Sequence, residues 1–302
     1  MTPLVDREFG ILTCATPSDY LKAIGLALSV RVSNPGVPIA VACSERVRPL
    51  VEPFFDVVTL EEKGIRGFVH KVYLDKYTPF KNTMFFDSDV LVFKPVAPYL
   101  DLWGNFPYRA VGDYRPDGIS SFGLDRVSAL KRLRKDNFVV IDGAGHALFR
   151  MPACIDVFDR AREVTSKHKE YFGDIQYADE DVMDYVMTEL DLPPAPAGDF
   201  FSRYLSARPG TMKLDATKGL CTFIRMDNGL PMSPCMMHFA ANEAPFPYHR
   251  QLRMLFRKFG VDESGLWRSA CTDFYQTKIH STLHRIKFNA MKKLGLKKVA
   301  SS

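Results

Sequence analysis

The sequence has no long hydrophobic stretch, no closely spaced cysteine pair and no apolar run among its first ten residues. No run of 18 or more apolar residues occurs in its 302 residues, so we expect no membrane-spanning helix. The first ten residues, MTPLVDREFG, carry charges where an export signal needs an apolar core. None of the six cysteines forms a CxxC pair, which favours reduced, buried thiols over a zinc or disulfide framework. These absences together predict a cytoplasmic protein.

Acidic residues are missing from the end of the chain. The segment 277–302 holds seven Lys and Arg residues and no Asp or Glu, and removing these seven from the formal net charge of +5 leaves −2 for the rest. A near-neutral body argues against nucleic-acid binding. Apolar residues recur at spacings of three and four over 278–294, which predicts an apolar stripe on a basic helix. Such a helix would let the protein lie peripherally on the anionic inner face of a membrane.

The chain does contain a regular alternation of apolar runs and helical segments. We predict four early strands, a helix at 18–33 with Ser18 as its N-cap, and a helical segment at 67–77. The strands are at 9–15, 38–43, 56–60 and 82–86. This alternation predicts an α/β fold with a mixed, mostly parallel sheet flanked by helices.

The second half of the chain is more mixed, with neither an internal repeat nor a linker. We therefore expect one domain over residues 1–260, followed by a C-terminal helical, basic amphipathic tail over 261–302. A Pro-rich loop is expected at 192–204. Further strands are predicted at 108–114, 137–142 and 146–150, and further helices at 151–169, 179–190 and, after Pro247, at 248–260.

Two carboxylates stand in the apolar run MFFDSDVLVF, residues 84–93, where the fourth strand ends. Side chains two residues apart in an extended chain point to the same side, roughly 7 Å apart, so Asp87 and Asp89 can converge on one cation. Oxygen ligands suit Mg²⁺ or Mn²⁺, and such an ion neutralises charge on a departing diphosphate. In parallel sheets ligands bind beyond the carboxyl ends of strands, where this pair lies. The alternative is that the aspartates only cap a turn or the next helix.

A second class of enzyme has the same motif. In haloacid-dehalogenase-like Mg-dependent phosphatases a hydrophobic strand precedes D-x-D-x-[TV], and the first aspartate, here Asp87, is the nucleophile. The later GDIQYAD, residues 173–179, superficially resembles their downstream acidic site. Two features count against this class: three predicted strands precede Asp87, and the residues before GDIQYAD are polar.

Several segments, in order, resemble glycosyltransferase family 8, whose members have the GT-A (Rossmann-like) fold. The likeness covers roughly residues 9–250 and rests on LTCATPSDYLKAIGLALSV, HKVYLDKYTPFKNTMFFDSDVLVFKPV, RAVGDY, ADEDVMDYV and HFAANEAPF. It implies a hexosyltransferase that moves a sugar, with retention, from a nucleotide donor, expected to be UDP-linked, to a glycan, lipid-linked or protein acceptor. It also implies Mn²⁺ (or Mg²⁺) as the cofactor, with His238 as the third ligand beside Asp87 and Asp89.

The resemblance also implies roles for individual residues. Asp179 and Glu180 take the catalytic positions, where Glu180 replaces the family's glutamine and would support the cationic sugar. Tyr20 and the loop 13–16 would hold the base, Lys71 the phosphate or sugar, and the acids downstream the sugar hydroxyls. The full set implied for donor binding is Thr13, Ala15, Thr16, Tyr20, Lys71, Asp87, Ser88, Asp89, Asp113 and Asp142.

Four of these residues also have a purely structural explanation. His238 lies in an apolar run, where a lone histidine is usually a satisfied core residue. Tyr20 can pack on a helix face, and Lys71 can be a solvated helix residue. Asp179 can serve as the N-cap of the helix it starts, because acids favour helix N-termini.

The sequence departs from the family pattern at the last motif and at one turn. The lysine that binds the diphosphate is Ala244 here and the tryptophan is Phe246, so we expect Arg250 or Arg253 to supply the lost charge. The family's N-[AS]-G turn aligns with residues 143–145 and lacks its asparagine, so Asp142 is expected to take over contacts with sugar hydroxyls. The missing lysine keeps a non-catalytic sugar- or lipid-binding relative as a further alternative.

Overall fold

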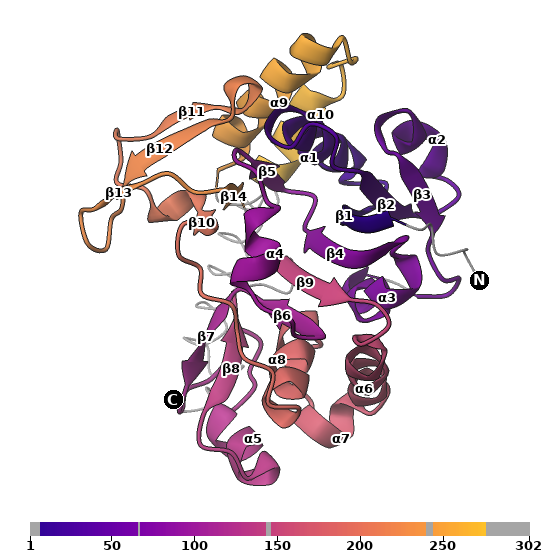
Figure 1. Ribbon diagram of the computed structural model, residues 1–302, viewed down its shortest axis with the longest axis vertical. Coiled ribbons are helices and arrows are strands. Elements are labelled where there is room, and N and C mark those ends of the chain that lie inside the picture. The colour runs from indigo at the N-terminus through magenta and orange to yellow at the C-terminus, as the bar shows by residue number, and fades with distance from the viewer. Residues whose placement is uncertain (1–6, 66, 143–145, 240–243, 276–302) are drawn as a thin grey trace, which may run out of the picture.

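A six-stranded sheet forms the centre of the computed structural model, which describes residues 7–275 except 66, 143–145 and 240–243 (Figure 1). The strand order is β3-β2-β1-β4-β9-β6. The first four strands run parallel, whereas β9 is antiparallel to both of its neighbours. Their bounds are β1 (Arg7–Ala15), β2 (Ile39–Cys43), β3 (Val57–Leu60), β4 (Phe80–Phe86), β6 (Tyr108–Ala110) and β9 (His146–Arg150). The predicted mixed, mostly parallel sheet is confirmed.

Helices cover both faces of this sheet, because the inner strands are apolar on both sides. Adjacent residues of β1 belong to two separate hydrophobic clusters: Ile11 packs on the face covered by α1 (Tyr20–Ser33) and α9 (Pro245–Phe259). Leu12 packs on the opposite face, which is covered by α6 (Ile155–Ser166) and α8 (Asp179–Glu189). Figure 1 shows these two helical layers on opposite sides of the sheet. Fully buried strands of this kind read as continuous apolar runs in a sequence.

Local boundaries differ from the sequence predictions at several helical segments. Ser18 is not the N-cap of α1, because the helix begins at Tyr20 and Asp19 takes the N-cap position. The Asp19 carboxylate accepts a hydrogen bond from the backbone N–H of Thr16 at 2.6 Å. The segment 67–77 is a 3₁₀ helix, η2 (Gly67–Tyr73), followed by the short α3 (Leu74–Tyr77). The helix predicted at 151–169 begins later and is divided into α6 and α7 (His168–Phe172).

A second, three-stranded sheet was not predicted. It has the order β10-β14-β5, formed by β10 (Phe201–Arg203), β14 (Met236–His238) and β5 (Val90–Val92). The prediction of a loop over 192–204 is therefore wrong for its last part, where β10 forms. Strand β14 runs antiparallel to β5 and parallel to β10, so His238 stands opposite both Val90 and Arg203.

The remaining elements are short. The strand predicted at 108–114 is divided into β6 and β7 (Gly112–Arg115), which belong to different sheets because β7 pairs only with β8 (Phe138–Ile141) among the described strands. The others are α2 (Arg48–Val51), η1 (Glu52–Phe54), α4 (Pro98–Leu102), α5 (Arg126–Leu133), η3 (Tyr204–Ser206), β11 (Lys213–Asp215), η4 (Ala216–Lys218), β12 (Leu220–Ile224) and β13 (Pro231–Met232).

The last described helix, α10 (Leu266–Phe274), packs against α9 and is tied to the body by a buried ion cluster. The Lys22 ammonium donates to the Asp273 carboxylate at 2.8 Å, and the Nε2 atom of His249 lies 3.0 Å from the same carboxylate. The division at residue 260 stays a prediction, and the apolar stripe over 278–294 lies outside the described residues. No described helix combines the length and apolarity needed to cross a bilayer.

Candidate active site

The candidate site lies where the strand order of the central sheet changes direction. Strands β1 and β4 are neighbours, although β2 and β3 come between them in sequence. Ligands of open α/β sheets bind beyond the carboxyl ends of the strands at such a switch point. Asp87 directly follows β4, the fourth strand of the chain, as the sequence predicted.

The turn that carries the two carboxylates is held by buried groups. The Val90 backbone N–H donates to the Asp87 carbonyl at 3.2 Å, and the Phe239 N–H donates to the Asp89 carbonyl at 3.1 Å. The hydroxyl of Tyr248, a fully buried residue of α9, donates to the Ser88 carbonyl at 3.2 Å. Sequence reasoning missed Tyr248, because nothing in the sequence links α9 to this turn.

The structure brings together the three residues expected to hold a metal. Asp87, Asp89 and His238 each offer one ligand atom, and these atoms all lie within 4.8 Å of one another. The Nε2 atom of His238 is 3.1 Å from Asp89 Oδ1. Burial would lower the pKa of His238, but the Asp89 carboxylate outweighs burial and raises this pKa. Two carboxylates and one imidazole form a ligand set that suits Mn²⁺.

Lys71 is not a solvated surface lysine. Its ammonium lies 2.9 Å from Asp87 Oδ1 and 3.2 Å from Asp179 Oδ2, and all three side chains are largely buried. Burial opposes the charge of Lys71, yet the two carboxylates more than compensate and raise its pKa. Lys71 therefore joins the metal-ligand pair to the first residue of α8.

Asp179 and Glu180 open α8 but do not cap it. The N-cap position belongs to Ala178, and the Asp179 carboxylate faces Lys71. The Glu180 side chain faces a cavity. Burial, together with the neighbouring Asp179 and Asp181, raises the pKa of Glu180 to about 7. The capping explanation for Asp179 is thus wrong, and both residues remain available to a ligand.

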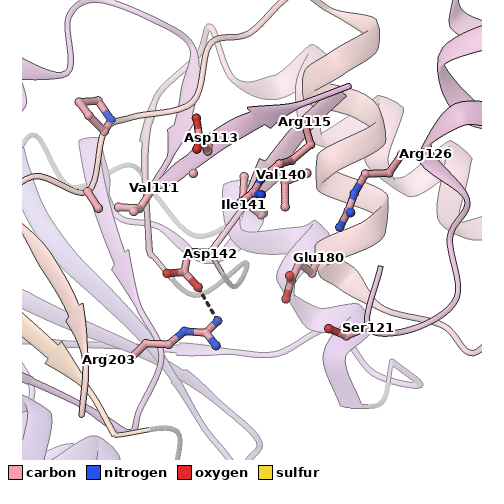
Figure 2. Close-up of a pocket in the computed structure, with 13 residues that line it drawn as sticks. Val111, Asp113, Arg115, Ser121, Arg126, Val140, Ile141, Asp142, Glu180 and Arg203 are labelled. Atoms are coloured by element: carbon pink, nitrogen blue, oxygen red, sulfur yellow. Dashed lines mark hydrogen bonds and ion pairs between the residues drawn. The ribbon is translucent and has the colours of Figure 1, made fainter. Parts of the chain in front are cut away.

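The cavity beside Glu180 has a volume of about 690 Å³ and is lined by charged residues of both signs (Figure 2). Asp113 and Asp142 line it, as expected for residues that orient a sugar. Asp142 forms an ion pair with Arg203, a residue of β10 that sequence reasoning missed. Sequence reasoning also missed Arg115 and Arg126, which line the same cavity.

The residues expected to hold the base lie at the end of β1. Thr13 and Ala15 are fully buried within the sheet, so neither is exposed to a ligand in this structure. Thr16 and Tyr20 are half-buried, and Tyr20, the first residue of α1, packs against the hydrophobic core. These positions lie beside the switch point, and their contact with a base stays a prediction.

The departures from the family motif have structural consequences on α9. Ala244 is buried and precedes α9 as its N-cap, whereas Phe246 is 44% exposed and packs against Phe274. Arg253 faces Glu263, with the two charged groups 4.0 Å apart, and Arg250 lines a separate cavity of about 410 Å³. Among the described residues, neither arginine contacts Asp87 or Asp89. The structure therefore gives no support to Arg250 or Arg253 as a substitute for the missing lysine.

No protein-family model and no curated protein matches this chain. Among solved structures it is similar to the galactosyltransferase LgtC, which was solved in complex with donor and acceptor sugar analogues. The two share 17% identity with a TM-score of 0.55, over 86% of this chain and 99% of LgtC. It is also similar to the bifunctional glycosyltransferase WbbM, with 12% identity and a TM-score of 0.53, over 85% of this chain and 53% of WbbM. The chain thus spans about half the length of WbbM.

These similarities establish the architecture. The chain has the fold of the GT-A glycosyltransferases, a mixed α/β fold with a mostly parallel central sheet. Membership of family 8 in particular stays a prediction, because identities this low show the fold alone.

Proposed function

We propose that this protein is a metal-dependent glycosyltransferase. It would transfer a hexosyl group from a nucleotide donor, expected to be UDP-linked, to a glycan, lipid-linked or protein acceptor, with retention of configuration. The observation that carries this proposal is the clustering of Asp87, Asp89 and His238 within 4.8 Å at the switch point of a GT-A fold.

The ligand set fits a resident Mn²⁺ or Mg²⁺ ion. Asp87 and Asp89 would supply carboxylate oxygens and His238 an imidazole nitrogen, and the buried Nδ1 atom of His238 has no hydrogen-bond partner among the described residues. A bound ion would neutralise the negative charge of the donor diphosphate. Because a nitrogen ligand takes part, Mn²⁺ is favoured over Mg²⁺.

Other residues of the chain would contact the diphosphate and the sugar of the donor. Lys71 holds Asp87 and Asp179 together, and its ammonium would turn to a phosphate or sugar oxygen of the donor. Asp113 and Asp142 would accept hydrogen bonds from sugar hydroxyls. The loop 13–16 and the Tyr20 ring would hold the base.

Glu180 fits a supporting role on the acceptor side of the sugar. With a pKa raised to about 7, it is close to half ionised at neutral pH. The ionised form would stabilise positive charge on the sugar as the donor bond breaks. The protonated form offers a hydrogen-bond donor, as does the glutamine that glycosyltransferase family 8 has at this position.

Cytoplasmic location and attachment to a membrane surface are proposed on sequence grounds alone. Both rest on the composition of the chain, the latter on residues 278–294, which lie outside the described residues.

A thermal-shift screen of UDP- and GDP-sugars, with and without Mn²⁺, tests this function. Ligand that binds only the native state raises the melting temperature, by an amount set by concentration and affinity. We expect a shift that requires both Mn²⁺ and one nucleotide, and its loss in Asp89→Asn. Asp174→Asn, at a side chain that is 83% exposed, is the matched control. The absence of a shift with every nucleotide sugar would refute the proposal.

Two further outcomes distinguish the alternative functions. Release of phosphate from an aryl phosphate with Mg²⁺, abolished by Asp87→Asn, would identify a phosphatase. The structure offers that activity little support, since Asp87 follows the fourth strand and Asp174 is exposed beside Lys169. Binding of a nucleotide sugar without hydrolysis or transfer would identify a non-catalytic relative.

A further inference from the structure

The cavity beside Glu180 contains more positive charge than neutral sugar hydroxyls require. Arg115, Arg126 and Arg203 line it together with Asp113, Asp142 and Glu180. Arg203 is paired with Asp142. Within the described part of the chain, neither Arg115 nor Arg126 forms an ion pair, although each presents a guanidinium group to the cavity.

Arg126 is the less solvated of these two arginines. Its Nε atom is shielded from solvent and has no hydrogen-bond partner among the described residues. Figure 2 shows its guanidinium extending into the cavity toward Glu180. A shielded, unpartnered guanidinium donor is costly unless a ligand satisfies it.

Two acids that interact electrostatically with Arg126, Asp181 and Asp184, already accept hydrogen bonds from other groups. Asp181 accepts a hydrogen bond from the Ser120 hydroxyl at 3.0 Å, and Asp184 accepts one from the Ile141 N–H at 2.8 Å. Burial raises the pKa of both acids, most strongly that of Asp184. The charge of Arg126 is therefore available to an anion in the cavity.

The position of the two arginines relates them to the acceptor rather than to the donor. Arg203 stands opposite the metal-ligand candidate His238 in the second sheet, and Glu180 follows Asp179. Arg115 and Arg126 come instead from β7 and α5. Figure 1 places these two elements at the end of the molecule away from β5 and β14. A sugar bound to a metal-held diphosphate would thus occupy the Glu180 end and leave the arginine end to the acceptor.

We propose that the acceptor is an acidic sugar, bearing a carboxylate or a phosphate that Arg115 and Arg126 bind. This inference rests on the proposed glycosyltransferase function. The planar guanidinium group matches both kinds of anion through paired hydrogen bonds. Asp113, which is proposed to bind the donor sugar, lies two residues from Arg115 on the same side of β7. An acceptor anion held by Arg115 would therefore lie next to the donor sugar.

The transfer itself is balanced without any further reactant. The acceptor hydroxyl oxygen bonds to the anomeric carbon of the donor sugar while the bond from that carbon to the diphosphate breaks. The bonding electrons leave with the diphosphate, and the hydroxyl proton passes to the departing diphosphate or to solvent.

Binding of matched saccharides, without donor or metal, tests the anion site separately from catalysis. The probes are methyl glucuronide and methyl galacturonide, the corresponding neutral methyl glycosides, and hexose 6-phosphates, titrated by calorimetry. We expect at least tenfold tighter binding of an acidic probe than of its neutral counterpart. The uronide and phosphate arms show which anion is preferred.

Variants of the two arginines identify the residues responsible. Arg115→Gln and Arg126→Met should each reduce the preference for the acidic probe by about tenfold, and Arg126→Lys should restore part of it. Lys131→Gln, which removes a positive charge from an exposed position of α5, should retain the preference. If Arg126→Met does not fold, as judged by circular dichroism, the proposal is tested with Arg115→Gln, which changes an exposed residue.

Three results would overturn the proposal. The first is equal binding of acidic and neutral probes, and the second is an acid preference that persists in both arginine variants. The third is an acid preference in binding that appears only when UDP-hexuronates are compared with UDP-hexoses. That result would show that the acidic group recognised by the arginines belongs to the donor sugar. Nucleotide-sugar binding without acid preference would remove this inference and leave the proposed function standing. Acid binding without any nucleotide-sugar binding would remove both the function and the acceptor role.

Discussion

The Glu180 carboxyl group makes the stability of the fold depend on pH. Its pKa is raised from an ordinary 4.5 to about 7 by burial and by the neighbouring Asp179 and Asp181. In the unfolded chain the group has its ordinary pKa, so ionisation favours unfolding. Its contribution to stability is therefore fully present below about pH 4.5 and is lost as the pH rises to about 7. The complete shift corresponds to about 3 kcal/mol.

Replacing Glu180 by glutamine removes this dependence, because the amide is neutral at every pH. Relative to the wild type, the free energy of unfolding of Glu180→Gln should rise by about 2 kcal/mol between pH 5 and pH 8. The value is smaller than the complete shift, since the wild-type unfolded chain is already largely ionised at pH 5 and the carboxylate opens into a cavity. Urea unfolding at both pH values measures it, provided the two proteins share one m-value.

A matched control separates the buried carboxyl group from a general effect of net charge. Glu170→Gln removes one negative charge from an exposed position of α7. The pH-dependent gain should be larger for Glu180→Gln than for this control. An equal difference between Glu180→Gln and wild type at pH 5 and pH 8 would refute the reasoning.

Three further changes address activity and packing. Glu180→Ala should lower the turnover number while the thermal shift caused by donor and Mn²⁺ persists; equal losses of both would exclude a role confined to the reacting sugar. Tyr248→Phe removes the hydrogen bond to the Ser88 carbonyl and should lower stability by about 1 kcal/mol, measured by urea unfolding. Lys22→Met leaves Asp273 buried without its ammonium and should cost about 3 kcal/mol. An unchanged urea midpoint in Lys22→Met would show that α10 is not held as described.

The central sheet could be predicted from the sequence because its strands are short, apolar and close to their partners along the chain. β1, β2 and β4 each contain a run of buried residues, and β3 appears as the short run VVTL. The helices between these strands have apolar faces. The carboxylate pair was placed correctly for the same reason, since it follows a strongly apolar strand. Interrupted segments were predicted less well. The run at 108–114 passes from one sheet to another at Val111, and the hydrophobic pattern of the sequence does not indicate this change.

The second sheet could not be predicted, because its strands are short and their partners are remote in sequence. Three residues give no measurable alternation, and β14 pairs with β5 only through tertiary packing. The cavity arginines were missed for a related reason. An isolated arginine in a polar segment looks like a surface residue, and only the fold shows that Arg126 and Arg203 face the same space as Glu180.

The pairing of β14 with β5 also bears on how the protein is assembled. His238 and Asp89 are separated by 149 positions along the chain. Contacts between such distant segments form late in folding, because a large loop must close before they can be made. During synthesis the nascent chain must extend past β14 before the ligand set can exist. Metal binding would therefore report on completion of the fold, and partly synthesised or misfolded chains would have no means of capturing the donor.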